Sequence, residues 1–155
     1  DRCRHREREQ VLIDLALHRN RGDGTFDPAV FFDGGGAGET ALAAGDADGD
    51  GYADLWVGNF NSSTVTLLRN DGQGNFTLSA SIGVGTRPWM IALADLDGDG
   101  DLDVATCDSS VNRASIVRGD GRGGFGGVTS LPSGVFPIAV DLGDLDGDGD
   151  VDVAI

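Results

Sequence analysis

An acidic nine-residue segment occurs three times in the chain at a constant interval. The copies cover residues 46–54, 95–103 and 144–152, so each begins 49 residues after the one before. A second pattern, an arginine followed by a glycine-rich turn and a phenylalanine, repeats in register with the first. Its phenylalanines are Phe26, Phe76 and Phe125. A period of this length predicts a propeller, a solenoid or an array of small units rather than one irregular globule.

The middle copy, residues 95–103, shows what such a segment requires. It carries acidic side chains at positions one, three, five, seven and nine, and glycines at positions four and six. Two like charges about 4 Å apart repel by ~4 kcal/mol at an effective dielectric constant of ~20, so this segment needs a cation. Hard oxygen ligands at alternate positions favour Ca²⁺, which accepts about 6–8 oxygens in a tolerant geometry, over Mg²⁺. We expect side-chain ligands from Asp95, Asp97, Asp99 and Asp103 and a backbone carbonyl from Asp101.

The flanks of the segment distinguish it from a helix–loop–helix calcium site. An EF-hand needs a bidentate glutamate at position twelve and a helix on each side. Position twelve of the middle copy is Thr106, and residues 102–107 are typical of a short strand. The sequence therefore predicts a calcium loop between two β-strands.

Strand-like stretches surround every copy. Before the first copy, Leu42 and Ala44 are apolar at alternate positions, which indicates a strand with one buried face. A second apolar stretch follows the acidic segment, and then come a Ser/Asn-rich loop, a third strand, the glycine-rich turn and a fourth strand. Four short antiparallel strands in 49 residues are typical of a β-propeller blade. We therefore predict an all-β fold with about three blades' worth of sheet.

The repeat divides the chain into five parts. Residues 1–10 match no part of the repeat and are expected to form an irregular leader. We expect strands three and four of one blade in residues 11–39, complete blades in 40–88 and 89–137, and strands one and two of another blade in 138–155. Such a chain is either a piece of a larger propeller, the interpretation that we favour, or one whose half-blades combine within the chain or between copies. An open array would leave exposed sheet edges, which promote aggregation.

Acidity dominates the composition, with a formal net charge of −15. The three segments hold 14 of the 26 acidic residues, and three Ca²⁺ ions would bring the net charge to −9. This balance excludes nucleic acid as a partner, because nucleic acid needs a basic face. No apolar run approaches the ~18 residues of a membrane span.

The repeat resembles the FG-GAP/VCBS repeats of integrin α-subunit-type β-propellers. The resemblance rests on the acidic segments, on residues 70–76 in the last hairpin, and on Gly85–Pro88 and Gly134–Pro137 before strand one. It implies seven-bladed propellers, mostly extracellular, in which each loop holds one structural Ca²⁺, with Tyr52, Asp101 and Asp150 offering backbone carbonyls. The ligand positions that it implies are Asp46, Asp48, Asp50, Tyr52 and Asp54; Asp95, Asp97, Asp99, Asp101 and Asp103; and Asp144, Asp146, Asp148, Asp150 and Asp152.

The expected function is recognition rather than catalysis. A calcium-stabilised extracellular module would serve adhesion or bind a carbohydrate or a protein, with self-association as a further possibility. The alternative is the propeller part of a polysaccharide lyase or hydrolase, but the two histidines are isolated and no nucleophile or zinc motif is present. Among the aromatic residues, we expect Trp56 to pack between blades, Trp89 to lie in the core and Phe60 to be exposed.

Overall fold

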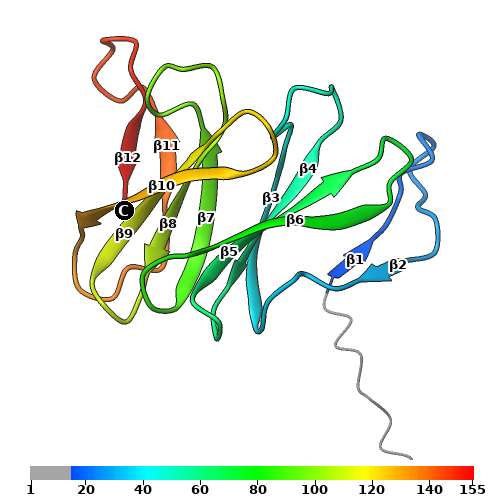
Figure 1. Ribbon diagram of the computed structural model, residues 1–155, viewed down its shortest axis with the longest axis horizontal. Helices are drawn as coiled ribbons and strands as arrows, with labels where there is room; N and C mark the ends of the chain where they lie inside the picture. The colour runs from blue at the N-terminus through cyan, green and yellow to red at the C-terminus, as the bar shows by residue number, and fades with distance from the viewer. Residues whose placement is uncertain (1–14) are drawn as a thin grey trace, which may run out of the picture. The chain divides into compact units, whose positions relative to one another are not determined.

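The computed structural model describes residues 15–155, and the expectations for residues 1–10 and for the start of the strand at 11–14 lie outside this range. Residues 15–155 form twelve β-strands and no α-helix, which confirms the all-β prediction (Figure 1). The strands are β1 (Leu15–Leu17), β2 (Val30–Phe32), β3 (Glu39–Gly45), β4 (Asp54–Asn59), β5 (Thr64–Asn70), β6 (Phe76–Gly83), β7 (Pro88–Ala94), β8 (Asp103–Asp108), β9 (Arg113–Gly119), β10 (Phe125–Pro132), β11 (Asp141–Gly143) and β12 (Asp152–Ala154).

The chain divides into two compact units, and the first ends at Asp33. Its described part is a single hairpin in which β1 pairs antiparallel with β2, from Leu15 opposite Phe32 to Leu17 opposite Val30. The second strand is short, and before it Phe26 makes only an isolated bridge to Asn20.

The second unit, residues 34–155, contains the two complete four-stranded sheets. Blade one is the meander β3-β4-β5-β6 and blade two is the meander β7-β8-β9-β10. The registers match across the period: Leu42 lies opposite Val57 in blade one, and Ile91 lies opposite Thr106 in blade two. Strands β11 and β12 form a separate antiparallel pair that corresponds to strands one and two of a blade.

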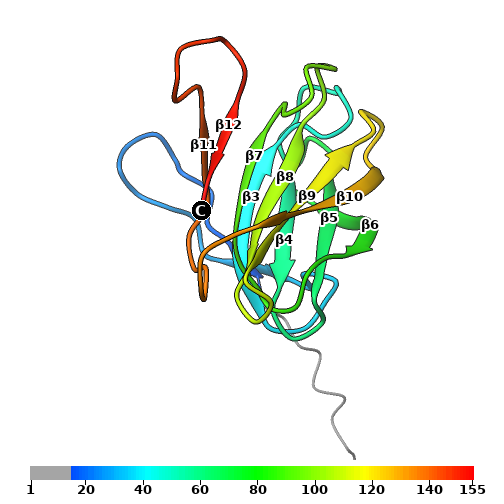
Figure 2. The same ribbon diagram turned by 90° about the vertical axis from the view of Figure 1, so that its left-hand side faces the viewer.

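The second strand of each blade lies at the centre of the packing. All six residues of β8 are buried, and β4 is nearly as buried, whereas the fourth strands β6 and β10 are mostly exposed. Strands β3 and β7 lie side by side (Figure 2). Trp56 of blade one is fully buried and its ring centroid lies 5.6 Å from that of Phe125 in blade two. The prediction that Trp56 packs between blades is confirmed.

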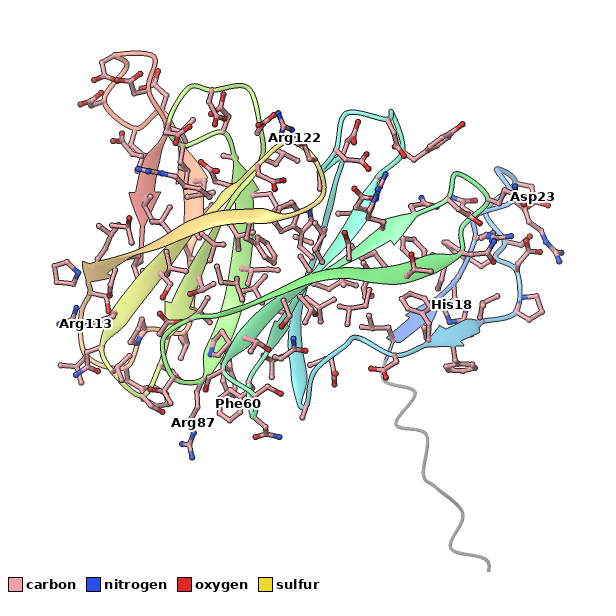
Figure 3. All side chains as sticks on the ribbon, viewed as in Figure 1. His18, Asp23, Phe60, Arg87, Arg113 and Arg122 are labelled. Carbon is pink, nitrogen blue, oxygen red and sulfur yellow. The ribbon has the colours of Figure 1, made fainter. Side chains whose placement is uncertain are left out.

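The other two aromatic predictions need correction. Trp89 is 42% exposed rather than in the core, and Phe60 is half-buried because it packs against Trp89, with ring centroids 5.3 Å apart. The guanidinium of Arg87 lies 5.4 Å from the Phe60 ring centroid. This cluster lies at the end of the sheets opposite the acidic loops (Figure 3), so its exposure reflects its place at the rim.

In each complete blade, a glycine before the first strand packs on the side chain that ends the second strand. A Cβ atom built on Gly85 would lie 2.5 Å from Cγ of Asp108, and one built on Gly36 would lie 2.5 Å from Nδ2 of Asn59. Gly36 and Gly85 therefore make the same close approach, one in each complete blade, and only a residue without a Cβ atom fits there.

We predict that Gly85→Ala lowers the free energy of unfolding by ~2 kcal/mol, because the added methyl group must displace the buried Asp108 side chain. The matched control is Gly134→Ala, one period later, where a Cβ meets nothing within 4 Å. Urea unfolding should place the control within about 0.5 kcal/mol of the parent. Equal losses in the two variants would contradict the packing argument.

Asp108 itself provides a pH-dependent test. Burial raises the pKa of its carboxyl group above the ordinary 3.8, opposed by hydrogen bonds from Ser115 at 2.6 Å and Thr106 at 2.7 Å. A raised pKa contributes stability that is complete below the unfolded pKa and is lost as pH rises through the folded pKa. Asp108→Asn gives blade two the residue type that Asn59 provides at the equivalent position of blade one. The unfolding free energy of this variant should therefore rise relative to that of the parent as pH increases from about 3 to 7. A constant difference in unfolding free energy across that range would refute this.

Candidate metal sites

Three acidic loops connect strands one and two of successive sheets. Loop one (residues 46–54) joins β3 to β4, loop two (95–103) joins β7 to β8, and loop three (144–152) joins β11 to β12, all at the same end of the sheets (Figure 1). Each loop brings three carboxylates together, with one oxygen from each within 4.8 Å of the others. The three groups are Asp46, Asp48 and Asp50; Asp95, Asp97 and Asp99; and Asp144, Asp146 and Asp152.

The aspartate at position one organises each loop through its two oxygens. In loop one, Oδ1 of Asp46 accepts from the backbone N–H of Gly49 at 2.8 Å, and Oδ2 accepts from Gly51 at 2.9 Å. Asp95 and Asp144 accept from the corresponding glycines of their own loops at 2.7–3.1 Å. Both glycines of every loop have positive φ, between 74° and 97°, which explains why glycine occupies positions four and six.

The aspartate at position five closes a further turn in each loop by accepting a hydrogen bond from the backbone N–H of position seven. Oδ1 of Asp50 accepts from the N–H of Tyr52 at 2.9 Å, and Asp99 and Asp148 repeat this bond to Asp101 and Asp150 at the same distance. The loops therefore share one hydrogen-bonding scheme, in which backbone donors fix the carboxylates before any metal binds.

The aspartate at position nine lies apart from the triad in loops one and two. Asp54 is fully buried and accepts from the N–H of Ala47 at 3.0 Å and of Asn70 at 2.8 Å. Asp103 accepts in the same way from Leu96 at 3.0 Å and Gly119 at 2.9 Å. This side chain ties the loop to the end of strand three. In loop three, Asp152 joins the triad instead.

Burial also perturbs the titration of Asp103. It raises the pKa of this carboxyl group, the two backbone N–H donors act in the opposite direction, and the nearby charges of Asp97 and Asp99 raise the pKa further. The charges of Asp97 and Asp99 therefore act on the buried carboxylate at position nine of the same loop.

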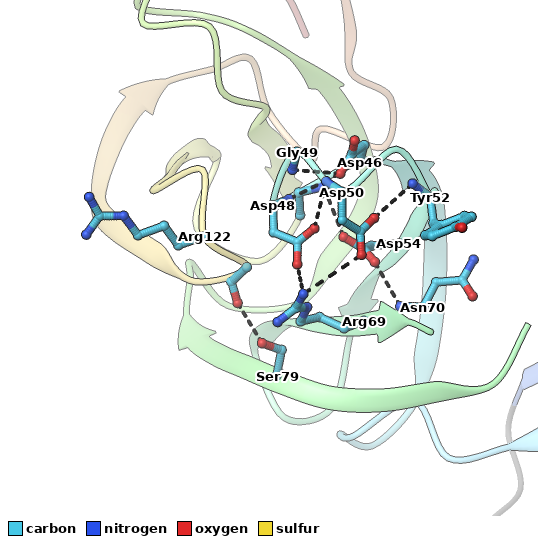
Figure 4. A network of polar contacts seen from close by, with 12 residues as sticks. Asp46, Asp48, Gly49, Asp50, Tyr52, Asp54, Arg69, Asn70, Ser79 and Arg122 are labelled. Atoms are coloured by element: carbon cyan, nitrogen blue, oxygen red, sulfur yellow. Dashed lines mark hydrogen bonds and ion pairs between the residues drawn. The ribbon is translucent and has the colours of Figure 1, made fainter. Parts of the chain in front are cut away.

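Two arginines that sequence reasoning did not assign to the loops contact them directly, and Figure 4 shows Arg69 with Asp48 and Asp50. Nη2 of Arg69 forms an ion pair with Oδ2 of Asp48 and lies 3.9 Å from Oδ2 of Asp50. Nε of Arg118 lies 3.1 Å from Oδ2 of Asp97. The available signal was the period itself, because each arginine stands 23 residues after the first aspartate of its loop.

Loop one also contacts the next blade. The N–H of Gly123, in the turn between β9 and β10, donates to the carbonyl of Ala47 at 3.1 Å. The carbonyl of Gly123 accepts from Oγ of Ser79 at 2.7 Å (Figure 4). Loop one is therefore part of the junction between blades one and two.

The donor set suits a hard divalent cation. Every side chain in the three groups is a carboxylate, and carboxylate oxygens are the ligands that Ca²⁺ and Mg²⁺ prefer. The three groups could each hold such an ion. Tyr52, Asp101 and Asp150 stand at position seven, where their backbone N–H groups bond to position five. Their predicted role as carbonyl ligands stays a prediction.

Within residues 15–155 the structure has no helix of the length and apolarity that crossing a membrane requires.

We predict that Asp103→Asn destabilises the protein in the presence of a chelator by ~1–3 kcal/mol, because an amide can accept from only one of the two buried N–H groups. Asp99→Asn removes the same charge from an exposed side chain and serves as the matched control, with an expected change within about 0.5 kcal/mol. Urea unfolding in EGTA measures both. Similar losses would show that position nine has no special structural role.

Comparison with known proteins agrees with the repeat in the sheets. No curated protein matches the chain. A family model described as an FG-GAP-like repeat matches residues 48–106 and 95–155, two overlapping stretches that each begin within an acidic loop. Together they cover more than half of the chain and include both complete blades' second strands. The chain belongs to the FG-GAP-like repeat family and is a β-propeller-like repeat module.

Proposed function

We propose that this protein is a calcium-stabilised, extracellular recognition module in which each acidic loop binds one structural Ca²⁺. The observation that carries the proposal is the same preformed acidic loop, built three times at one end of the sheets. The side chains that would hold the ions are those of the three triads, and the ion would supply the positive charge that their mutual repulsion requires.

Calcium suits these loops better than magnesium. Several aspartates each use one oxygen to fix the backbone, which leaves the second oxygen for an ion but does not impose an octahedral arrangement. Mg²⁺ needs near-ideal octahedral geometry and keeps several waters, whereas Ca²⁺ tolerates irregular oxygen cages. Exposed loops of this kind favour an extracellular setting, because extracellular modules bind Ca²⁺ with dissociation constants of about 10⁻⁴–10⁻³ M.

The partner surface in this proposal is the opposite end of the sheets. Phe60, Arg87 and Trp89 form a half-exposed cluster there, with contributions from both blades. Aromatic rings and an arginine are enriched where proteins bind partners, and exposed rings also stack on sugars. The proposed ligand is therefore a protein or a carbohydrate, and the module itself is proposed to be non-catalytic.

We predict that Ca²⁺ raises the melting temperature of the protein and that excess EGTA reverses the rise. Each occupied site contributes ~2.7 kcal/mol when free Ca²⁺ is about 100 times the dissociation constant, provided that the unfolded chain does not bind it. Differential scanning calorimetry measures the shift, and titration calorimetry should give about three ions per chain. The control is Mg²⁺ at the same concentration, which should shift the transition less. An unchanged melting temperature would refute the calcium proposal.

A further inference from the structure

Arg69 and Arg118 occupy the same place in their blades and contact the same position of their loops. Arg69 lies near the end of β5 and Arg118 near the end of β9. Each directs its guanidinium at Oδ2 of the position-three aspartate, which is Asp48 in loop one and Asp97 in loop two. The contact therefore recurs in both complete blades.

The contacted oxygen in loop one belongs to a nearly buried carboxylate. The Asp48 side chain is 5% exposed, and its Oδ1 already accepts from the N–H of Asp50 at 3.2 Å. Its Oδ2 has no conventional hydrogen bond, so the guanidinium of Arg69 is the group that neutralises it. Asp48 also belongs to the triad proposed to hold Ca²⁺. Arg69 thus contacts a carboxylate that is also a proposed calcium ligand.

The arginine must weaken calcium binding whether or not it moves. If the ion takes Oδ2 of Asp48, the ion pair with Arg69 is lost; if the guanidinium stays, it lies within a few ångströms of a second positive charge and repels it. Arginine keeps its charge at any physiological pH, so this opposition is permanent. The same charge stabilises the metal-free loop, because it offsets repulsion among Asp46, Asp48 and Asp50.

The effect should be larger in loop one than in loop two. Arg69 faces two carboxylates, its side chain is 44% exposed, and its Cδ lies under Gly123 of the next blade. Arg118 faces one carboxylate and is 57% exposed. Exposed ion pairs are screened by solvent and contribute little.

We infer that Arg69 and Arg118 are resident counter-ions that lower the calcium affinity of loops one and two while stabilising the metal-free loops, an inference that rests on the proposed function. The arginine narrows the free-energy difference between the metal-free and the calcium-bound loop, because it stabilises the first and destabilises the second. Affinity is thus set by a residue that is not itself a ligand.

Loop one can be observed separately from the others. Tyr52 is the one tyrosine of the chain and stands in this loop. Nε1 of Trp56 donates to the carbonyl of Gly45, the residue just before the loop, at 3.4 Å. Tb³⁺ bound in loop one accepts energy from these rings and emits, and Ca²⁺ that displaces it removes the emission. The midpoint of this displacement reports the calcium affinity of loop one.

We predict that Arg69→Gln raises the calcium affinity of loop one by about three- to tenfold, the range expected for removing one partly screened charge. Arg118→Gln, in the other blade, and Arg122→Gln, which removes the same charge from an exposed turn position, should stay within about twofold of the parent. Arg69→Lys keeps the charge and should also match the parent. In EGTA, Arg69→Gln should melt below Arg122→Gln, and calcium should abolish or reverse that difference.

The outcomes separate this inference from the function on which it rests. If the parent shows neither sensitised Tb³⁺ emission nor a calcium-dependent melting shift, the calcium proposal fails and the inference fails with it. If the parent binds Ca²⁺ and folded Arg69→Gln, checked by circular dichroism, binds it no more tightly than Arg122→Gln, only the inference is overturned. Opposite signs of the affinity change and the metal-free stability change support it, because simple structural damage would lower both.

Discussion

Repulsion among the aspartates of each acidic loop is the constraint around which the repeat is built. Three carboxylates approach within 4.8 Å in every loop, and the backbone meets this charge with N–H groups at fixed positions. Those donors point inward only because the two glycines take positive φ. Strand pairing begins directly at the ends of these loops, with Gly45 opposite Asp54 and Ala94 opposite Asp103. The proposed Ca²⁺ would add the positive charge that these N–H groups supply only in part.

The aspartate at position nine attaches loops one and two to their sheets. Asp54 and Asp103 are buried at the start of strand two and bind one N–H group in the loop and one at the end of strand three. The two hydrogen bonds replace part of the hydration that each carboxylate loses on burial, and so offset part of the cost of burying it. Position nine therefore serves the sheet as much as the loop. An alternating row of aspartates contains two kinds of residue, which the spacing alone does not distinguish.

The sequence predicted the regular features of the fold and missed those that depend on contacts between distant segments. The period and the alternation of apolar residues predicted the four-stranded sheets, because both are local properties of the chain. The positions of the acidic loops followed for the same reason. The expectation that Leu42 and Ala44 mark a buried face was wrong, because both side chains are exposed on β3. One partner of Asp54 lies at the end of strand three, the partner of Asp48 is Arg69, and Trp89 is exposed at a rim that its apolar neighbours do not reveal. Each depends on which side chains the folded sheet brings together.

The junction between the blades shows how a local charge arrangement reaches beyond its own sheet. Ala47 occupies position two of loop one, donates its N–H to Asp54 and accepts from Gly123 of the next blade. Its carbonyl can meet Gly123 only if the loop holds one conformation, and the same turn leads into Phe125, whose ring packs on Trp56. Whatever orders loop one therefore also orders the polar edge of an otherwise apolar interface. Neutralisation of the loop by Arg69, or by the proposed Ca²⁺, should therefore stabilise the contact between blades as well as the turn itself, because both use backbone groups of Ala47.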